Sequence, residues 1–419
     1  MHFFASFCLF KYNFSGNQDF LWFPGQETCL IQLNYTSSKN SSICIELNMD
    51  PVQAAVYEEI SKVLAHYDLG ELVKFEQNLL GYNNTNFCIR TDKLGVIKDY
   101  FFRRYKAEIL AGEIIFEHAV INHLLEQDFD LVAGVHPTKK GETYIARQAG
   151  DGSTAPRYYA VFDFLEGEDR YTWIDPQLSS AEVQSAASVL AQFHHAVANF
   201  NPPGQRIEAT ILELLPSISD NLKSGLVKSK GTAFDAALEE HLPFLLEHCS
   251  EMHAYCADLD WSAAPQMVIH CDYHPGNLKF RAQEVVGIFD FDWSKIDLRC
   301  FDVGLAIWYL SHWKGDLDGI LRLDESLQFL RTYQESLVQQ PNLAPLTEFE
   351  LQQLPVMINL GNLYILNWTI MDYYAKHVDV DEYLVYLHHS INFSHWFATR
   401  SQKTIQNILL SADGVTLSD

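Results

Sequence analysis

The spacing of hydrophobic residues changes character along the chain. Residues 51–66 carry apolar side chains at helical spacing behind an Asp-Pro start, which is typical of a helix N-terminus. In the next part, apolar and aromatic residues alternate or form short runs, which indicates strands. The predicted strands are residues 72–80, 86–91, 95–105 and 158–164, and an amphipathic helix is predicted at residues 106–126.

Helical spacing dominates from residue 181 onward. The predicted helices are residues 181–199, 321–335, 348–374 and 382–401, with another beginning near Phe301. Two short apolar runs at residues 267–269 and 285–289 interrupt this pattern and are predicted to be strands.

Each of these two short runs leads into side chains with catalytic potential. The loop after the first run contains four of them: His270, Asp272, His274 and Asn277. The second run ends in Asp290 and Asp292. Phosphoryl transfer from ATP needs a carboxylate to orient the acceptor hydroxyl and oxygen ligands to hold Mg²⁺ on the phosphates. Asp272 suits the first task, whereas Asn277 and Asp290 suit the second.

The same residues carry a family resemblance. His-Cys-Asp-Tyr-His-Pro-Gly-Asn at residues 270–277 resembles the HxDxxxxN catalytic loop of aminoglycoside phosphotransferase and choline kinase-like enzymes, and Ile-Phe-Asp-Phe-Asp at residues 288–292 resembles their counterpart of the protein-kinase DFG motif. The resemblance implies a protein-kinase-like α+β fold. A five-stranded antiparallel N-lobe with one long helix would precede a mostly helical C-lobe, with ATP between them. His270 joins Asp272 as a catalytic-loop candidate, although positioning suits it better than acid or base chemistry.

The predicted nucleotide site includes a candidate phosphate loop at residues 81–86. Gly81 lets the backbone approach a phosphate closely. Three side chains beside it offer donors: Asn83, Asn84 and Thr85. A structural hairpin is the competing interpretation of this segment.

Two further residues complete the predicted phosphate contacts by resemblance. Arg103 occupies the position of the family's strand cation, and Glu117 that of the helix acid that fixes it. Arg104 and Glu113 compete for these roles, and alternation along the strand lets only one arginine face the nucleotide. Asp163 and Leu165, where an apolar strand runs into an acidic turn, are predicted at the hinge that reads adenine.

The short distance in sequence from Asp290 to Asp302 leaves no room for a peptide-docking activation segment, so a small hydroxylated metabolite is the expected acceptor. Within the family, the Asn-Asn-Thr-Asn loop and the Phe-Arg-Arg-Tyr strand most resemble the homoserine kinase type II branch. Aminoglycosides, choline, ethanolamine and sugars are alternative acceptors. Asn359, Asn367 and Trp368 could line the acceptor pocket, but core packing is the stronger interpretation.

Other interpretations of the motif segment remain open at this stage. The Pro-Gly-Asn stretch could be a hairpin in which Asp and Asn cap the backbone. His270, Asp272 and His274 could instead bind the metal of a hydrolase. A nucleotide-binding pseudokinase would keep the fold without the catalysis. Asp302, placed ten residues after Asp292, is an ordinary helix N-cap by itself, although in the family it resembles an acid that steadies the catalytic loop.

Composition narrows the partners and the domain organisation. The net charge of −25 argues against nucleic acid and anionic membranes as binding partners. The scattered cysteines favour a cytoplasmic protein with reduced thiols. The protein is expected to be a monomer or a homodimer. Residues 1–48 are expected to be an extension of doubtful structure, with Met49 a plausible true start. Residues 49–165 are the predicted N-lobe, 166–405 the C-lobe and 406–419 a tail.

Overall fold

The structure is a computed structural model that describes residues 50–78, 84–148, 155–338, 340–376 and 378–400. Gly81, Asn83 and the predicted extension and tail at residues 1–48 and 406–419 lie outside the described residues. The chain divides into two compact units, Met1–Glu58 and Glu59–Asp419. In the first, the Asp50 carboxylate accepts hydrogen bonds from the backbone of Val52 and Gln53, both at 2.8 Å, and so caps helix α1 (Pro51–Leu64).

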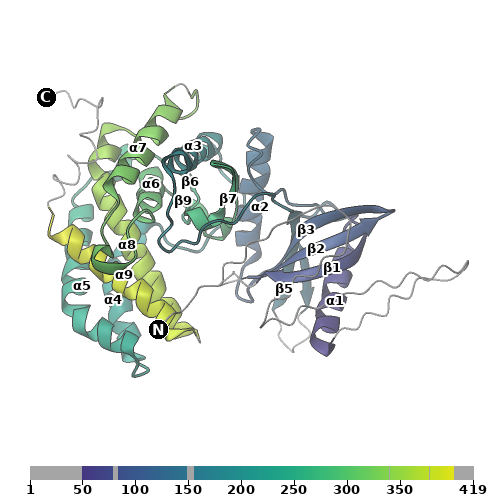
Figure 1. Cartoon of the computed structure of the whole chain (residues 1–419), viewed down its shortest axis with the longest axis horizontal. Coiled ribbons are helices and arrows are strands. Elements are labelled where there is room, and N and C mark those ends of the chain that lie inside the picture. Colours follow the sequence, from purple (N-terminus) through teal and green to yellow (C-terminus); the bar gives the residue numbers. More distant parts are fainter. Residues whose placement is uncertain (1–49, 79–83, 149–154, 339, 377, 401–419) are drawn as a thin grey trace, which may run out of the picture. The chain divides into compact units, whose positions relative to one another are not determined.

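The second unit contains a five-stranded antiparallel sheet with the strand order β1-β2-β3-β5-β4 (Figure 1). Its strands are β1 (Glu71–Asn78), β2 (Thr85–Lys93), β3 (Val96–Arg104), β4 (Ile145–Gln148) and β5 (Pro156–Asp163). Leu94 and Gly95 join β2 to β3 with φ of 56° and 85°, the left-handed pair that a tight hairpin turn requires. This hairpin places Asn86 directly opposite Arg103.

Helix α2 (Ala111–Glu126) begins five residues later than the predicted helix at residues 106–126. Leu110 is extended, and its backbone N–H donates to the Glu113 carboxylate at 2.9 Å, so the capping interaction sets the first turn here. Glu113 and Glu117 are both buried, one helical turn apart. Packing and capping, rather than the apolar pattern, therefore determine where α2 starts.

The remaining helices form the larger, helical part of the second unit (Figure 1). They are α3 (Ser180–Val197), α4 (Ile211–Val227), α5 (Ala233–Ala257), α6 (Arg299–Trp308), α7 (Leu323–Leu337), α8 (Glu348–Ala375) and α9 (Val380–Ala398). The sequence prediction omitted α4 and α5, which contain Pro216 and Pro243, but a capping box at Thr210 and another at Thr232 were readable start signals. None of the helices among the described residues combines the length and apolar character that a membrane span requires.

Two short antiparallel ribbons carry the motif segment. Strand β6 (Gln266–Ile269) pairs with β9 (Lys295–Leu298), and β7 (Leu278–Arg281) pairs with β8 (Glu284–Ile288). The catalytic loop therefore lies between β6 and β7, and the acidic residues lie between β8 and β9. The Phe289 N–H donates to the Asn277 carbonyl at 3.1 Å, which ties the two loops together.

Helix α6, which follows β9, packs closely against α8. A Cβ at Gly304 would lie 2.7 Å from the Met357 carbonyl carbon, so only glycine permits this approach. The close crossing fixes α6, which carries Asp302 in its first turn and ends next to Tyr309.

Burial lowers the pKa of five of the buried histidines: His118, His194, His248, His270 and His389. For His118, burial and the nearby Arg103 charge lower the pKa to about 3. Its imidazole is held neutral between the Tyr105 hydroxyl and the Thr143 hydroxyl, each at 2.9 Å.

We expect the free energy of unfolding to fall as the pH drops below about 6.5, the ordinary pKa of histidine. In this window an unfolded histidine binds a proton that folded His118 does not, so its stabilisation is present above pH 6.5 and is lost toward pH 3. One such histidine contributes a slope of about 1.4 kcal/mol per pH unit. Urea denaturation at pH 7, 6 and 5 measures the slope. His118→Gln should make it shallower, with the exposed His66→Gln as control, and an unchanged slope would contradict the assignment.

Candidate active site

Asp302 organises the backbone of the catalytic loop. Its carboxylate accepts the N–H groups of His270 at 2.9 Å and Cys271 at 2.8 Å, and the His194 imidazole at 3.0 Å. Burial alone would raise the pKa of Asp302, but these donors, His194 above all, hold it below its ordinary value. Of the two interpretations of Asp302, the ordinary N-cap is wrong, because α6 begins at Arg299, whereas the bonds to the loop backbone agree with an acid that steadies this loop.

The bonds from Asp302 hold a backbone conformation that is unfavourable by itself. Cys271 has a φ of 62°, which side chains with a Cβ rarely adopt. His270 is fully buried, and burial lowers its pKa, so it is a neutral imidazole. Its Nε2–H donates to the Phe289 carbonyl at 3.0 Å. His270 is thus linked to Asp290 through the carbonyl of Phe289, the residue before Asp290.

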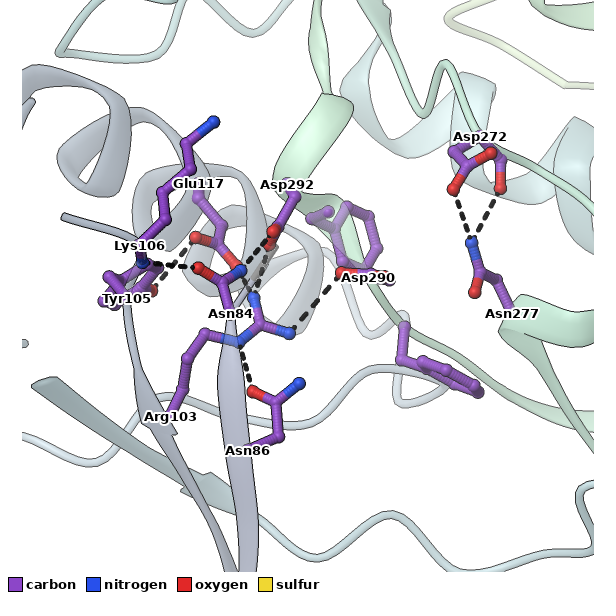
Figure 2. Close-up of polar contacts among 12 residues, drawn as sticks. Asn84, Asn86, Arg103, Tyr105, Lys106, Glu117, Asp272, Asn277, Asp290 and Asp292 are labelled. Carbon is purple, nitrogen blue, oxygen red and sulfur yellow. Dashed lines mark hydrogen bonds and ion pairs between the residues drawn. The ribbon is translucent and has the colours of Figure 1, made fainter. Parts of the chain in front are cut away.

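Asp272 is held by donors on both of its carboxylate oxygens. The Tyr309 hydroxyl donates to Oδ1 at 2.7 Å. The Asn277 amide donates to Oδ2 at 3.0 Å, as Figure 2 shows. His274 Nε2 lies 3.6 Å from Oδ2. Although burial would raise the pKa of Asp272, His274 and Tyr309 keep it below its ordinary value. Asp272 is therefore an oriented carboxylate that can accept a hydrogen bond from a third group.

Arg103 lies at the centre of a second polar cluster (Figure 2). Its Nη1 donates to Glu117 at 2.9 Å and to Asp292 at 2.5 Å, and its Nη2 lies 3.5 Å from Asp290. Its Nε donates to the Asn86 side chain at 3.2 Å. The side chain of Arg103 is 7% exposed and that of Glu117 is 2% exposed. These acids hold the pKa of Arg103 above its ordinary value despite the effect of burial.

Arg104 and Glu113, the residues that competed with Arg103 and Glu117 in the sequence prediction, make other contacts. Arg104 pairs with Glu59 at 2.8 Å and contacts the Thr85 hydroxyl at 3.3 Å, as the alternation along β3 requires. Thr85 is therefore not brought to the Arg103 cluster. Asn84 is, because its amide donates to the Asp292 carboxylate while its oxygen accepts the Lys106 N–H at 3.0 Å.

The turn after β8 concentrates negative charge. Asp290 has a φ of 65°, and burial together with the Asp292 carboxylate raises its pKa well above the ordinary value. Burial raises the pKa of Glu117 as well. Arg103 alone does not balance the three acids around it, so the arrangement favours an additional cation.

The side chains between the two loops suit Mg²⁺. Asn277 uses its amide nitrogen on Asp272, which leaves its oxygen pointing away from that residue (Figure 2). The Asn277 oxygen and the Asp290 carboxylate are hard oxygen donors, the kind of ligand that Mg²⁺ accepts from a protein while it retains several waters. In the described part of the chain, no group of three His, Cys, Asp or Glu side chains is arranged to hold a metal ion.

Of the two predicted hinge residues, Asp163 is the last residue of β5 and Leu165 follows two residues later. The Asp163 carboxylate accepts bonds from His136 at 3.0 Å and Lys98 at 3.1 Å, and its backbone N–H donates to the Gly134 carbonyl at 2.8 Å. Leu165 lies against β8, since a Cβ at Gly287 would be 2.6 Å from the Leu165 side chain. Leu165 therefore packs on the strand that delivers Asp290.

A cluster of aromatic side chains lies next to Tyr309, the residue that donates to Asp272. The Trp173 ring lies 6.3 Å from that of Tyr309, 4.4 Å from Tyr386 and 6.3 Å from Trp368, measured between ring centroids. Trp173 and Trp368 are only partly buried. Asn359, by contrast, is fully buried against His248, and Asn367 accepts a bond from Asn221.

For the site, Asn86 was predicted only as the last residue of the candidate phosphate loop at residues 81–86, and three further residues were left out of the predicted site: Asp292, Tyr309 and Trp173. The hairpin register, which pairs Asn86 with Arg103, was a signal for the contact between those two side chains. Asp292 had been noted only as half of an acidic pair. Tyr309 follows Asp302 by two helical turns and so shares its face of α6. Trp173 lies in a loop, where no periodic pattern could have identified it.

Comparisons with known proteins agree with this geometry. The model of the family described as "Phosphotransferase enzyme family" matches residues 74–335. Homoserine kinase of Methylocella silvestris is 26% identical over 315 residues, which cover 72% of this chain and 83% of the relative.

Solved structures show the same fold at lower identity. The microcompartment-associated aminopropanol kinase superposes with a TM-score of 0.57 at 17% identity, covering 82% of this chain and 97% of that one. The amicoumacin kinase hAmiN, in complex with AMP-PNP, Ca²⁺ and Ami, gives 0.56 at 14% identity, covering 82% and 93%. The protein-kinase-like, two-lobed α+β prediction is confirmed. The chain belongs to the phosphotransferase enzyme family, as a small-molecule kinase with a hydroxyl group as acceptor.

Proposed function

We propose that this protein transfers the γ-phosphoryl group of ATP, with Mg²⁺, to the hydroxyl of homoserine or a similar amino alcohol. The observation that carries the proposal is the Asp272 carboxylate, which is held between Tyr309 and Asn277 in the loop tied to the turn that contains Asp290. Asp272 accepts the hydrogen bond of the acceptor hydroxyl, orients its oxygen toward the phosphate and takes its proton as the new bond forms.

The nucleotide site is inferred from the residues around Arg103. Asn277 and Asp290 would hold Mg²⁺, which when bound neutralises charge on the phosphates. Engagement of Asp290 there would free Nη2 of Arg103 for a phosphate oxygen, while Glu117 and Asn86 keep the guanidinium in place. Asn84 would add a donor, and Leu165 with the backbone after Asp163 would contact adenine. The complex of amicoumacin kinase with AMP-PNP supports nucleotide use in this fold.

The acceptor class is inferred from the aromatic side chains near Tyr309. An ammonium group is attracted to the faces of Trp and Tyr rings. Trp173 presents a partly exposed ring next to Tyr309, the residue that donates to Asp272, and Trp368 presents another next to Trp173. Homoserine and aminopropanol, the substrates named for two similar proteins, are both amino alcohols. In this proposal the N-lobe extends over residues 49–165 and the C-lobe over 166–405.

Removing the Asp272 carboxylate should abolish acceptor phosphorylation without weakening nucleotide binding. We expect Asp272→Asn to lower kcat by about 10²- to 10⁴-fold, because the acceptor loses its base and orienting group. A coupled assay of ADP release with Mg-ATP and homoserine, ethanolamine, choline, aminoglycosides or sugars measures this. Asp169→Asn, an exposed acid paired with Lys279, is the control. Absence of turnover with every acceptor would contradict the proposed function.

Trp173 should determine affinity for the ammonium group of the acceptor. We expect Trp173→Leu to raise the KM of the best amino alcohol by about 3- to 30-fold, the equivalent of a lost cation–π contact, and to leave the KM of ATP unchanged. A neutral diol of equal length should be insensitive to the substitution. Trp261→Leu, which removes a partly buried ring packed on Phe349, is the matched control. Equal losses with the amine and the diol would count against recognition of an ammonium group.

A further inference from the structure

The segment between α3 and α4 is inserted against the first turn of α2. Gly204 has a φ of 88°, and a Cβ there would lie 2.3 Å from the Gly112 carbonyl oxygen and 2.6 Å from the Phe116 nitrogen. The next residue, Gln205, donates its N–H to the Gly112 carbonyl at 3.0 Å. The backbone of this segment is therefore fixed on α2, and it presents Arg206 at a defined position.

Arg206 extends from that position to the acidic turn, which we define as residues 290–294. Its Nε donates to the Ser294 carbonyl at 2.9 Å, and its Nη2 donates to the Phe291 carbonyl at 2.8 Å. Its Nη1 lies 3.7 Å from Oε1 of Glu113, and its guanidinium carbon is 5.9 Å from the centre of the Phe116 ring. The side chain is 5% exposed. A single guanidinium thus connects Glu113 of α2 with the carbonyls of Phe291 and Ser294 in the acidic turn.

The charge of the buried Glu113 carboxylate is compensated by its contact with Arg206. Its Oε2 accepts the Leu110 N–H, whereas its Oε1 is buried without a hydrogen-bond partner in the described part of the chain. The charge of Arg206 at 3.7 Å is what compensates that oxygen. Glu113 lies one helical turn before Glu117, the acid that holds Arg103. Arg206 therefore joins the helix that fixes Arg103 to the turn that carries Asp290.

We propose that Arg206 is a positioning residue, which sets the separation of Asp290 from Arg103 by clamping the acidic turn to the first turn of α2. The positive φ of Asp290 is a conformation that needs external support, and the bonds from Arg206 to the carbonyls of Phe291 and Ser294, which follow Asp290 in the turn, supply it. The clamp requires the planar fork of arginine, because one lysine ammonium cannot reach two carbonyls and a carboxylate in this geometry. What the turn binds rests on the proposed function; the clamp itself does not.

The first measurement is hydrogen–deuterium exchange of the full-length chain. We expect Arg206→Lys to accelerate exchange both at residues 288–295 and at residues 110–114, because both segments lose the same support. Arg299→Lys is the matched control, since Arg299 is also buried, 1% exposed, and also bonds backbone carbonyls and a glutamate, at Ala344, Pro345 and Glu350. The control should lower Tm and leave these two segments unchanged. Wild-type exchange there in Arg206→Lys would overturn the proposal.

The second measurement is calorimetric binding of AMP-PNP with and without Mg²⁺. Support of metal-holding residues from behind typically changes metal affinity by about 10- to 100-fold, so Arg206→Lys should weaken Mg²⁺-dependent binding by about that factor and leave metal-free binding unchanged. Arg206→Met combined with Glu113→Gln, which leaves no uncompensated buried charge, should behave in the same way. Faster exchange with unchanged Mg²⁺ dependence would overturn the positioning role. Absence of nucleotide binding by the wild type would overturn the proposed function, while exchange still decides the clamp.

Discussion

The guanidinium of Arg103 is the contact on which the arrangement of the site depends. It lies between Glu117 from α2, Asn86 from β2 and the two acids of the turn after β8, so elements distant in sequence meet at one side chain (Figure 2). Removing one partner of such a buried cluster is typically destabilising by about 3–5 kcal/mol, because the remaining charges stay uncompensated. The cluster therefore enforces a single geometry for the acids, which hydrophobic packing alone would not specify.

A second buried network plays the same part for the catalytic loop. Asp302 accepts the backbone of His270 and Cys271, and His194 in turn is bonded to Asp302 and, at 2.8 Å, to the Tyr333 hydroxyl. The bonds offset the unfavourable φ of Cys271, and the close crossing of α6 and α8 at Gly304 fixes Asp302 itself. Asp272 is thus positioned by Asn277 within its own loop and also through a chain of contacts that begins in the helical core.

Local patterns predicted the parts of the molecule in which sequence neighbours act together. Four strands of the sheet followed from alternating or short apolar runs, whereas the five-stranded antiparallel arrangement followed from the family resemblance, and β4 was not predicted. Asp272, Asn277 and Asp290 were identified from their spacing within one short segment. Residues whose role depends on distant partners were not accessible in this way. Tyr309 reaches Asp272 only because α6 is packed behind the loop, and Arg206 reaches the acidic turn only because Gly204 lets its segment press against α2. The late start of α2 has the same origin, since capping by Glu113 outweighs the apolar pattern.

The electrostatics of the site connect the two networks with the proposed chemistry. Burial and mutual repulsion raise the pKa of Asp290, whereas donors lower that of Asp272, so two carboxylates of one site are driven in opposite directions. A group with a raised pKa gains from a cation, and a group with a lowered pKa remains an anion ready to accept a proton-bearing hydroxyl. In a chain with a net charge of −25, the proposed nucleotide site would offer phosphates the positive charge of Arg103 together with that of a bound metal ion. In the proposed function, the excess of acid that the metal would relieve therefore favours binding of the nucleotide where Asp272 orients its acceptor.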